Sequence, residues 1–235
     1  MKIAVPKFIR NYDYALACLE ALKTSGLGRY IVLGGAFGLA HYFEYRTTKD
    51  IDAWWTENAG ENEKKAVISL LENTLKNFGD VSIRRFGDVV SIDLFREGQV
   101  IFNFQIAQRS ALLRAPLGSA WSPVSLDSLD DLIASKMTAL IERGAPRDFL
   151  DIYQVCANKI VTIRRCWELW KEREVKRGNH SPDTRLGCEA LLLHLSRIER
   201  VRPLDTIKDK RERQQAETLR HWFKNEFCKG KLLLD

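Results

Sequence analysis

Residues 33–55, LGGAFGLAHYFEYRTTKDIDAWW, combine a glycine pair with two aspartates that are separated by one residue. The preceding run RYIVL (29–33) is apolar and short, which predicts a buried strand that ends at the glycines. KDIDAWW (49–55) alternates polar and apolar residues with the period of two that is typical of a strand. We therefore expect a glycine turn that opens a helix, followed by a strand that carries two carboxylates.

On such a strand Asp50, Asp52 and Trp54 project to one side, with the two carboxylates about 7 Å apart. Neighbouring ionised carboxylates repel each other, and one divalent cation such as Mg²⁺ between them, or an ion pair, relieves that repulsion. The backbone N–H groups of Gly34 and Gly35 can approach phosphate oxygens because no Cβ intervenes. Each piece has an ordinary alternative: a turn for the glycines, surface or capping positions for the aspartates, and core packing for Trp54.

The remaining pattern predicts an α/β (α+β) region with a small mixed sheet, followed by a mostly helical region. After an amphipathic helix within 63–79 come three β-rich runs at 81–86, 89–95 and 100–107, the last two joined by a turn in which Gly98 supplies positive φ. From Ser128, whose spacing to Asp131 resembles a helix cap, the sequence is helical in five segments: 129–144, 146–159, 162–178, 188–201 and 209–227. The predicted domains are 1–115 and 116–235.

The charge is unevenly distributed along the chain. Residues 1–150 hold 18 basic and 18 acidic side chains, whereas residues 151–235 hold 19 basic and 13 acidic ones, so the whole net charge of +6 lies beyond residue 150. A basic segment of this kind fits a polyanion such as RNA, or a solvated helical surface. The aromatic residues among these charges, Trp167, Trp170, Trp222 and Phe223, suit an RNA groove. Trp167 and Trp170, at a spacing of three, are more typical of a helical core, so only the charges favour nucleic acid.

Other composition signals narrow the class of protein. No apolar run approaches the roughly 20 residues of a membrane span, and the start MKIAVPKFIRNYDY lacks the core of a secretion signal, so we expect a cytoplasmic protein without membrane contact. The five cysteines have no C-x-x-C spacing, which indicates reduced thiols rather than a disulfide framework or a zinc site. The four histidines likewise lack metal-ligand spacing.

The combination of strand, glycine pair, helix and RTTKDID resembles the signature of the nucleotidyltransferase superfamily with the polymerase-β-like fold. Within that superfamily the chain is most similar to the AbiEii/AbiGii-type toxins of type IV toxin–antitoxin systems. Arg46, Thr48, Asp50 and Asp52 match the family pattern Arg-x-Ser/Thr-x-Asp-x-Asp.

A second segment carries the same resemblance. SKMTALIERGAPRDFLDIY (135–153) matches the family's helical lysine, Arg-Asp pair and further aspartate with Lys136, Arg147, Asp148 and Asp151. The resemblance spans residues 29–155, and the rest of the chain is identified only as helical and basic.

The resemblance implies metal-dependent transfer of a nucleoside monophosphate from an NTP, with Mg²⁺ or Mn²⁺ held by Asp50, Asp52 and a third carboxylate. Asp93 on the strand VVSIDLF is the candidate third ligand and base, and Asp88 in FGDVV is its competitor. Nucleotide binding is assigned to Gly34, Gly35, Arg46, Thr48 and Lys136.

The same resemblance assigns roles in the second segment. Lys136 contacts the triphosphate, Asp148 orients Lys136 or a substrate hydroxyl, and Arg147 contacts substrate or pairs with Asp151.

The family further implies a toxin that modifies RNA, with tRNA as the expected acceptor, and a possible cognate antitoxin. Two other functions stay open: transfer to a small molecule such as an aminoglycoside or to a protein side chain, and nucleotide binding without turnover.

Overall fold

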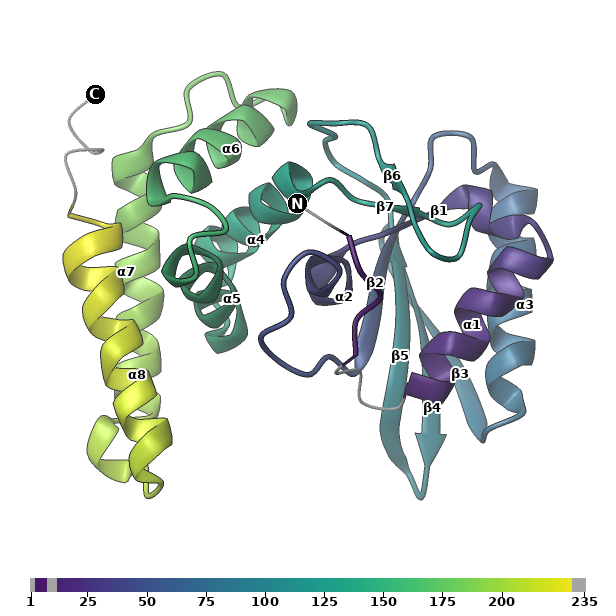
Figure 1. The fold of residues 1–235 in the computed structure, drawn as a ribbon, viewed down its shortest axis with the longest axis horizontal. Helices are drawn as coiled ribbons and strands as arrows, with labels where there is room; N and C mark the ends of the chain where they lie inside the picture. Colours follow the sequence, from purple (N-terminus) through teal and green to yellow (C-terminus); the bar gives the residue numbers. More distant parts are fainter. Residues whose placement is uncertain (1–2, 8–11, 230–235) are drawn as a thin grey trace. The chain divides into compact units, whose positions relative to one another are not determined.

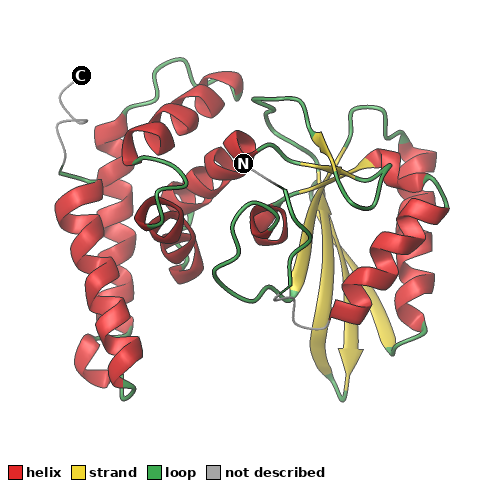
Figure 2. Cartoon of the chain, viewed as in Figure 1, coloured by secondary structure: helices red, strands yellow, loops and turns green. Residues whose placement is uncertain are grey.

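The computed structural model describes residues 3–7 and 12–229, and the chain divides into two compact units, Met1–Leu132 and Ile133–Asp235. Among the described residues, every strand lies in the first unit, and the second consists of helices and their connections (Figures 1 and 2). This arrangement confirms the predicted fold class, a mixed α/β region followed by helices.

The first unit contains a seven-stranded mixed sheet with the strand order β3-β4-β5-β2-β1-β7-β6. Strand β2 is parallel to β5 and β1 is parallel to β7, whereas the other pairs are antiparallel. The strands are β1 (Ile31–Leu33), β2 (Asp50–Trp55), β3 (Asp80–Phe86), β4 (Val89–Arg96), β5 (Gln99–Ala107), β6 (Leu117–Gly118) and β7 (Ser125–Leu126).

Two helices, α1 (Tyr12–Thr24) and α3 (Glu61–Lys76), lie side by side against one face of this sheet (Figure 1). Alternate strand residues point toward them, and Ile51, Ile92 and Phe104 are fully buried there. Because the strand period is two, the intervening residues all point to the opposite face. The apolar half of each strand thus builds the core and leaves the polar half on the other face.

The turn between β4 and β5 has two residues with positive φ, Glu97 at 51° and Gly98 at 74°. Both values fall in the left-handed region, as two-residue hairpin turns require, and glycine adopts that region without a Cβ clash. The predicted hairpin and the positive φ of Gly98 are confirmed.

The helix that follows the glycines is shorter than predicted. The run AFGLAHYFEY (36–45) has room for about three helical turns, but α2 covers Gly35–Ala40 only. Beyond it, the Tyr42 hydroxyl donates a hydrogen bond of 2.7 Å to the carbonyl oxygen of Asp127. This contact with a residue far along the chain holds the segment after α2 in a non-helical path toward β2.

The first unit extends beyond the predicted boundary at residue 115. Strand β7 pairs with β1, opposite Val32 and Leu33, and β6 pairs with β7, so residues 117–126 complete the sheet. Both strands are only two residues long, which is too short for the period-two signal that marked the others.

The second unit consists of five α-helices and their connections within the described residues: α4 (Leu129–Glu142, beginning in the first unit), α5 (Pro146–Ala157), α6 (Ile163–Lys176), α7 (Thr184–Val201) and α8 (Lys210–Trp222), with the short turns η2 (Leu204–Thr206) and η3 (Phe223–Phe227). The backbone N–H of Asp131 donates to Ser128 Oγ, which confirms the predicted cap of α4. Trp167 and Trp170 are buried and contact each other, so they form core as predicted. Trp222 and Phe223 are buried as well, which does not fit a place in an RNA groove.

None of the described helices is both long enough and apolar enough to cross a membrane.

Candidate active site

The polar half of the sheet presents two rows of side chains that cross three strands. Asp50 on β2 is paired with Asn103 on β5, and Asn103 is paired with Asp93 on β4. One step along, Asp52 is paired with Gln105, and Gln105 with Ser91. Paired residues share a face, so these six side chains all lie on the face away from α1 and α3. We call this surface the polar face.

The glycine turn lies directly against this face at Asp52. Gly35 has φ +57°, and a Cβ at that position would overlap the Asp52 carboxylate. A Cβ at Gly34 would approach Nε1 of Trp54 to 2.5 Å, and the Gly34 N–H donates to the Asp52 carbonyl oxygen at 2.8 Å. Only glycine combines that φ with so close an approach. The predicted proximity of the glycine pair and the carboxylate strand is therefore present.

Asp93 lies on the same face as Asp50 and Asp52, but strand β5 separates it from them. Two strand spacings of about 4.8 Å each lie between its backbone and that of Asp50. Its carboxylate is 1% exposed and accepts hydrogen bonds from Arg84 Nε at 2.6 Å, Ser91 Oγ at 3.1 Å and Asn103 Nδ2 at 2.6 Å. Donors contact both of its oxygens, and Arg84 balances its charge.

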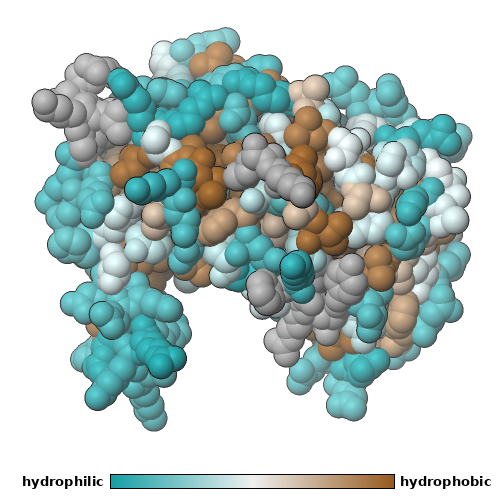
Figure 3. All heavy atoms as spheres, viewed as in Figure 1, coloured by the Kyte–Doolittle hydropathy of each residue, from teal (hydrophilic) through white to brown (hydrophobic). Residues whose placement is uncertain are grey.

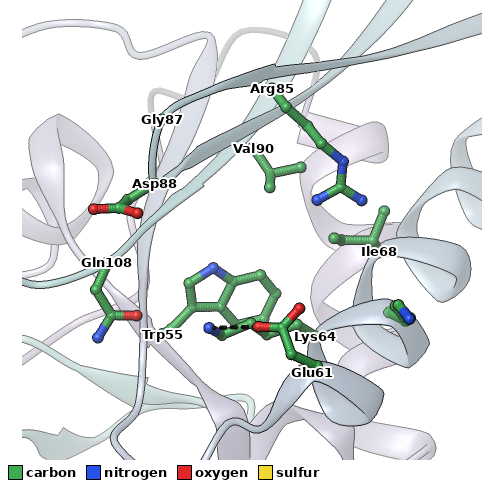
Figure 4. A pocket seen from close by; sticks show the side chains of 10 residues that line it. Trp55, Glu61, Lys64, Ile68, Arg85, Gly87, Asp88, Val90 and Gln108 are labelled. Carbon is green, nitrogen blue, oxygen red and sulfur yellow. Dashed lines mark hydrogen bonds and ion pairs between the residues drawn. The ribbon is translucent and has the colours of Figure 1, made fainter.

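The competitor Asp88 lies in the turn between β3 and β4 and is exposed. It lines a pocket together with Trp55 and Val90, two residues that point to the helix-covered side of the sheet (Figure 4). Of the two candidates for the third carboxylate, only Asp93 is on the polar face.

Trp54 is fixed at the edge of the polar face by a buried ion pair that the sequence did not reveal. Its indole N–H donates to Asp127 Oδ2 at 2.8 Å, and the Arg109 guanidinium lies 5.5 Å from its ring centre while contacting Asp127 Oδ1. Burial raises the pKa of Asp127 to about 6, and the charge of Arg109 opposes that shift. Trp54 is therefore tied to its neighbours on both its N–H edge and one ring face.

Gln105 is a polar-face residue that the sequence analysis missed. Its backbone is directly opposite Asp52. Its side chain is half-buried, and the side-chain amide has no hydrogen-bond partner within the described part of the chain. The neighbouring Asn103, in contrast, donates to Ser91 and Asp93. The alternation in VIFNFQIA carried the signal, because Asn103 and Gln105 interrupt an otherwise apolar strand at every second position.

Arg46 and Thr48, the other predicted nucleotide contacts, lie in the connection that leads from α2 to β2. The Arg46 guanidinium lies 5.9 Å from the Tyr45 ring centre. Thr48 is 4% exposed, and its hydroxyl has no partner among the described residues. Both residues precede Asp50 by a few positions, so they lie close in sequence to the start of β2.

In the second unit, the predicted lysine and aspartates meet within the hairpin formed by α4 and α5. Lys136 Nζ lies 2.6 Å from Asp151 Oδ2, and both side chains are buried. Asp148, also fully buried, is held by two hydrogen bonds from Arg143, at 2.8 and 3.0 Å. The partner of Lys136 is thus Asp151, whereas Asp148 pairs with Arg143.

Distance from the connection explains this pairing, because Asp148 lies one turn nearer the connection than Asp151 and pairs with Arg143, which directly follows α4. Arg147 is exposed and makes no side-chain ion pair within the described residues.

The donor set of the polar face is suited to a hard divalent cation. Asp50 and Asp52 offer carboxylate oxygens on adjacent same-face positions, and Asp52 has no side-chain partner within 3–7 and 12–229. In the same ranges no group of three or more His, Cys, Asp or Glu side chains is close enough to enclose a metal. Mg²⁺ is commonly held by one or two carboxylates together with substrate phosphates, so an adjacent pair is sufficient.

Comparison with known families agrees with this geometry. Residues 17–226 match the family model described as the nucleotidyl transferase AbiEii toxin of type IV toxin–antitoxin systems. The chain belongs to the AbiEii family. No curated protein and no solved structure gave a significant match.

Membership in the AbiEii family makes the chain a toxin-type nucleotidyltransferase and implies an antitoxin as its counterpart. The matched residues include both the glycine turn with its carboxylate strand and the α4–α5 hairpin. The two segments that carried the sequence resemblance therefore lie inside the AbiEii match.

Proposed function

We propose that this AbiEii protein transfers a nucleoside monophosphate from an NTP to a hydroxyl of RNA, with tRNA as the expected acceptor, and that transfer requires Mg²⁺ or Mn²⁺. The observation that supports this proposal is the placement of Asp50 and Asp52 side by side on the polar face, with Gly35 against Asp52. A carboxylate pair beside a glycine turn fits a metal-bound triphosphate.

Each residue of the polar face has its own role in the proposed transfer. Asp50 and Asp52 hold the divalent cation, which when bound neutralises charge on the triphosphate. The backbone of Gly34 and Gly35 borders the phosphates. The acceptor oxygen forms a bond to the α-phosphorus while the bond to the leaving pyrophosphate breaks, and Asp93 takes the hydroxyl proton.

Three further residues complete the proposed nucleotide contacts. Arg46 and Thr48 bind the nucleotide from the connection before β2. Lys136 supplies positive charge to triphosphate oxygens, where negative charge grows as pyrophosphate departs.

The RNA part of the proposal rests on charge at one end of the α7–α8 hairpin. Five basic side chains there have no carboxylate partner among the described residues, and all but the half-buried Arg213 are exposed: Arg200, Lys208, Lys210, Arg211 and Arg213. We call this group the basic tip, and hydrophilic side chains cover this part of the hairpin in Figure 3. Other basic residues of this part of the chain are paired, Arg202 with Glu212 and Lys224 with Glu199. Unpaired exposed cations are the ones that neutralise RNA phosphates.

The test is incubation of the protein with total cellular RNA and each labelled NTP in turn, with Mg²⁺ or with EDTA. Wild type is expected to label RNA of tRNA size only with Mg²⁺, and Asp52→Asn to lose at least about 100-fold in rate, because a metal-binding carboxylate becomes a neutral amide. The matched control is Asp80→Asn, which neutralises an exposed aspartate at the start of β3.

Label on protein, or on an added aminoglycoside but on no RNA, would replace RNA with the other acceptor class. Binding of NTP without any transfer would favour a module that does not turn over.

A further inference from the structure

A pocket of about 290 Å³ opens on the side of the sheet away from Asp50 and Asp52. It lies where the first turn of α3 meets the ends of β2, β3 and β4, and none of its lining residues belongs to the polar face (Figure 4). The residues that line it are Trp55, Glu61, Lys64, Lys65, Ile68, Arg85, Gly87, Asp88, Val90 and Gln108. The pocket is therefore separate from the proposed transfer site.

Positive charge gathers on one side of this pocket. Lys64 is paired with Glu61 at 3.2 Å, whereas Lys65 and Arg85 have no carboxylate partner in the parts of the chain that the structure describes. The guanidinium of Arg85 extends over Ile68 toward α3 in Figure 4, and Asp88 and Gln108 lie on the far side. Two unpaired cations from different elements thus face one cavity.

The floor of the pocket is apolar but offers one donor. Ile68 and Val90 are buried side chains of the core, and Trp55 is only 4% exposed. The indole N–H of Trp55 makes no hydrogen bond to another described residue, and the ring lines the cavity. This N–H is not among the buried donors that lack a partner, so it is open to the cavity and can donate to an acceptor that enters the pocket.

We propose that this pocket binds a small phosphorylated ligand, with its phosphate between Arg85 and Lys65 and its apolar or planar body over Ile68, Val90 and Trp55. The planar guanidinium matches two phosphate oxygens at once, and a lysine adds a point charge from a second direction. The volume is at the lower end of the range for small-molecule sites, which fits pyrophosphate or a mononucleotide rather than a larger cofactor.

The decisive experiment is titration calorimetry in EDTA at constant ionic strength, with inorganic phosphate, pyrophosphate, AMP and adenosine as probes. Removing divalent cations leaves Asp50 and Asp52 to repel phosphate, while a site built from cationic side chains still binds it. Wild type is expected to bind AMP or pyrophosphate in EDTA, with adenosine at least about tenfold weaker than AMP. Tighter binding of AMP than of pyrophosphate would identify the ligand as a mononucleotide, and tighter binding of pyrophosphate would identify it as pyrophosphate.

Arg85→Gln and Lys65→Gln are each expected to weaken that binding about tenfold or more, since each removes a charge-assisted hydrogen bond. Lys76→Gln is the matched control, because it removes a lysine from the opposite end of α3, where Lys76 pairs with Glu72. All three side chains are on the surface, and circular dichroism melting curves check that the variants fold.

Three outcomes overturn the proposal: binding of neither AMP nor pyrophosphate by wild type in EDTA, measurable binding of adenosine and AMP with equal affinity, or unchanged binding by Arg85→Gln and Lys65→Gln. Because divalent cations are absent from these titrations, a negative result has no bearing on the proposed transfer at the polar face.

Discussion

At the residue scale, Asp93 presents a carboxylate that already accepts three hydrogen bonds where the proposed reaction needs a proton acceptor. Arg84, Ser91 and Asn103 contact it, and it lies on the same face as the metal-binding pair. These contacts fix its position and also give it an alternative, purely structural role. A substitution that keeps the shape and removes only the basicity separates the two.

Asp93→Asn is expected to lower kcat by at least about 100-fold, the lower end of what a general base contributes. Affinity for the NTP with Mg²⁺ should fall much less, because Asp50 and Asp52 remain. Steady-state kinetics with calorimetry of nucleotide binding measures both. Ser91→Ala is the control, since it removes one hydrogen bond from the same carboxylate and leaves the base intact. A variant Asp93→Asn that keeps more than half of wild-type kcat contradicts the role as base.

The residues that sequence reasoning placed well are those whose role depends on local periodicity. The spacing of two in KDIDAWW put Asp50 and Asp52 on one face, and the register with β5 agrees. Arg109 and Asp127, by contrast, contact Trp54 from positions far along the chain. No local pattern encodes a contact of that range, so the cluster became visible only in the folded unit.

At the scale of elements, long periodic segments were predicted and short ones were missed. The strands β6 and β7 are two residues each, and the end of α2 depends on the Tyr42 contact with Asp127. In the α4–α5 hairpin, Asp148 and Asp151 share a helix face at a spacing of three, so the sequence could not decide which one pairs with Lys136. The fold decides it through the distance of each from the connection.

The buried pair of Lys136 and Asp151 combines a structural role with the proposed role in transfer, and a double variant separates them. Asp151→Leu is expected to lower the free energy of unfolding by about 3–5 kcal/mol, because it leaves the Lys136 ammonium buried without its partner. Lys136→Met together with Asp151→Leu should recover most of that loss, since an apolar pair can replace a buried ion pair. Denaturant unfolding measures both.

Transfer by the double variant is expected to remain absent, because the methionine side chain that replaces Lys136 carries no charge for the triphosphate. A stable double variant with wild-type transfer would limit Lys136 to a structural role. Lys171→Met, on a different helix of the same unit, controls for the loss of one lysine.

At the scale of the whole molecule, the net positive charge is confined to the C-terminal part of the chain. The first 150 residues are neutral overall, and the +6 excess lies beyond them. Ion pairs such as Arg177 with Glu142 and Lys224 with Glu199 neutralise part of this positive charge. The basic tip keeps its charges unpaired, so it accounts for more of the field felt by a polyanion than the net charge alone indicates.

If the basic tip binds RNA, Lys210→Glu with Arg211→Glu should weaken RNA association at low salt and reduce the slope of log K against log salt by about one for each RNA phosphate that is no longer neutralised. Filter binding of tRNA across a salt series measures this, and NTP binding to the same variant should be unchanged. The control, Lys159→Glu with Lys171→Glu, alters net charge equally in the second unit but outside the tip. Equal weakening by both pairs would show that RNA responds to total charge, whereas weakening confined to the tip variant assigns the footprint to the end of the α7–α8 hairpin.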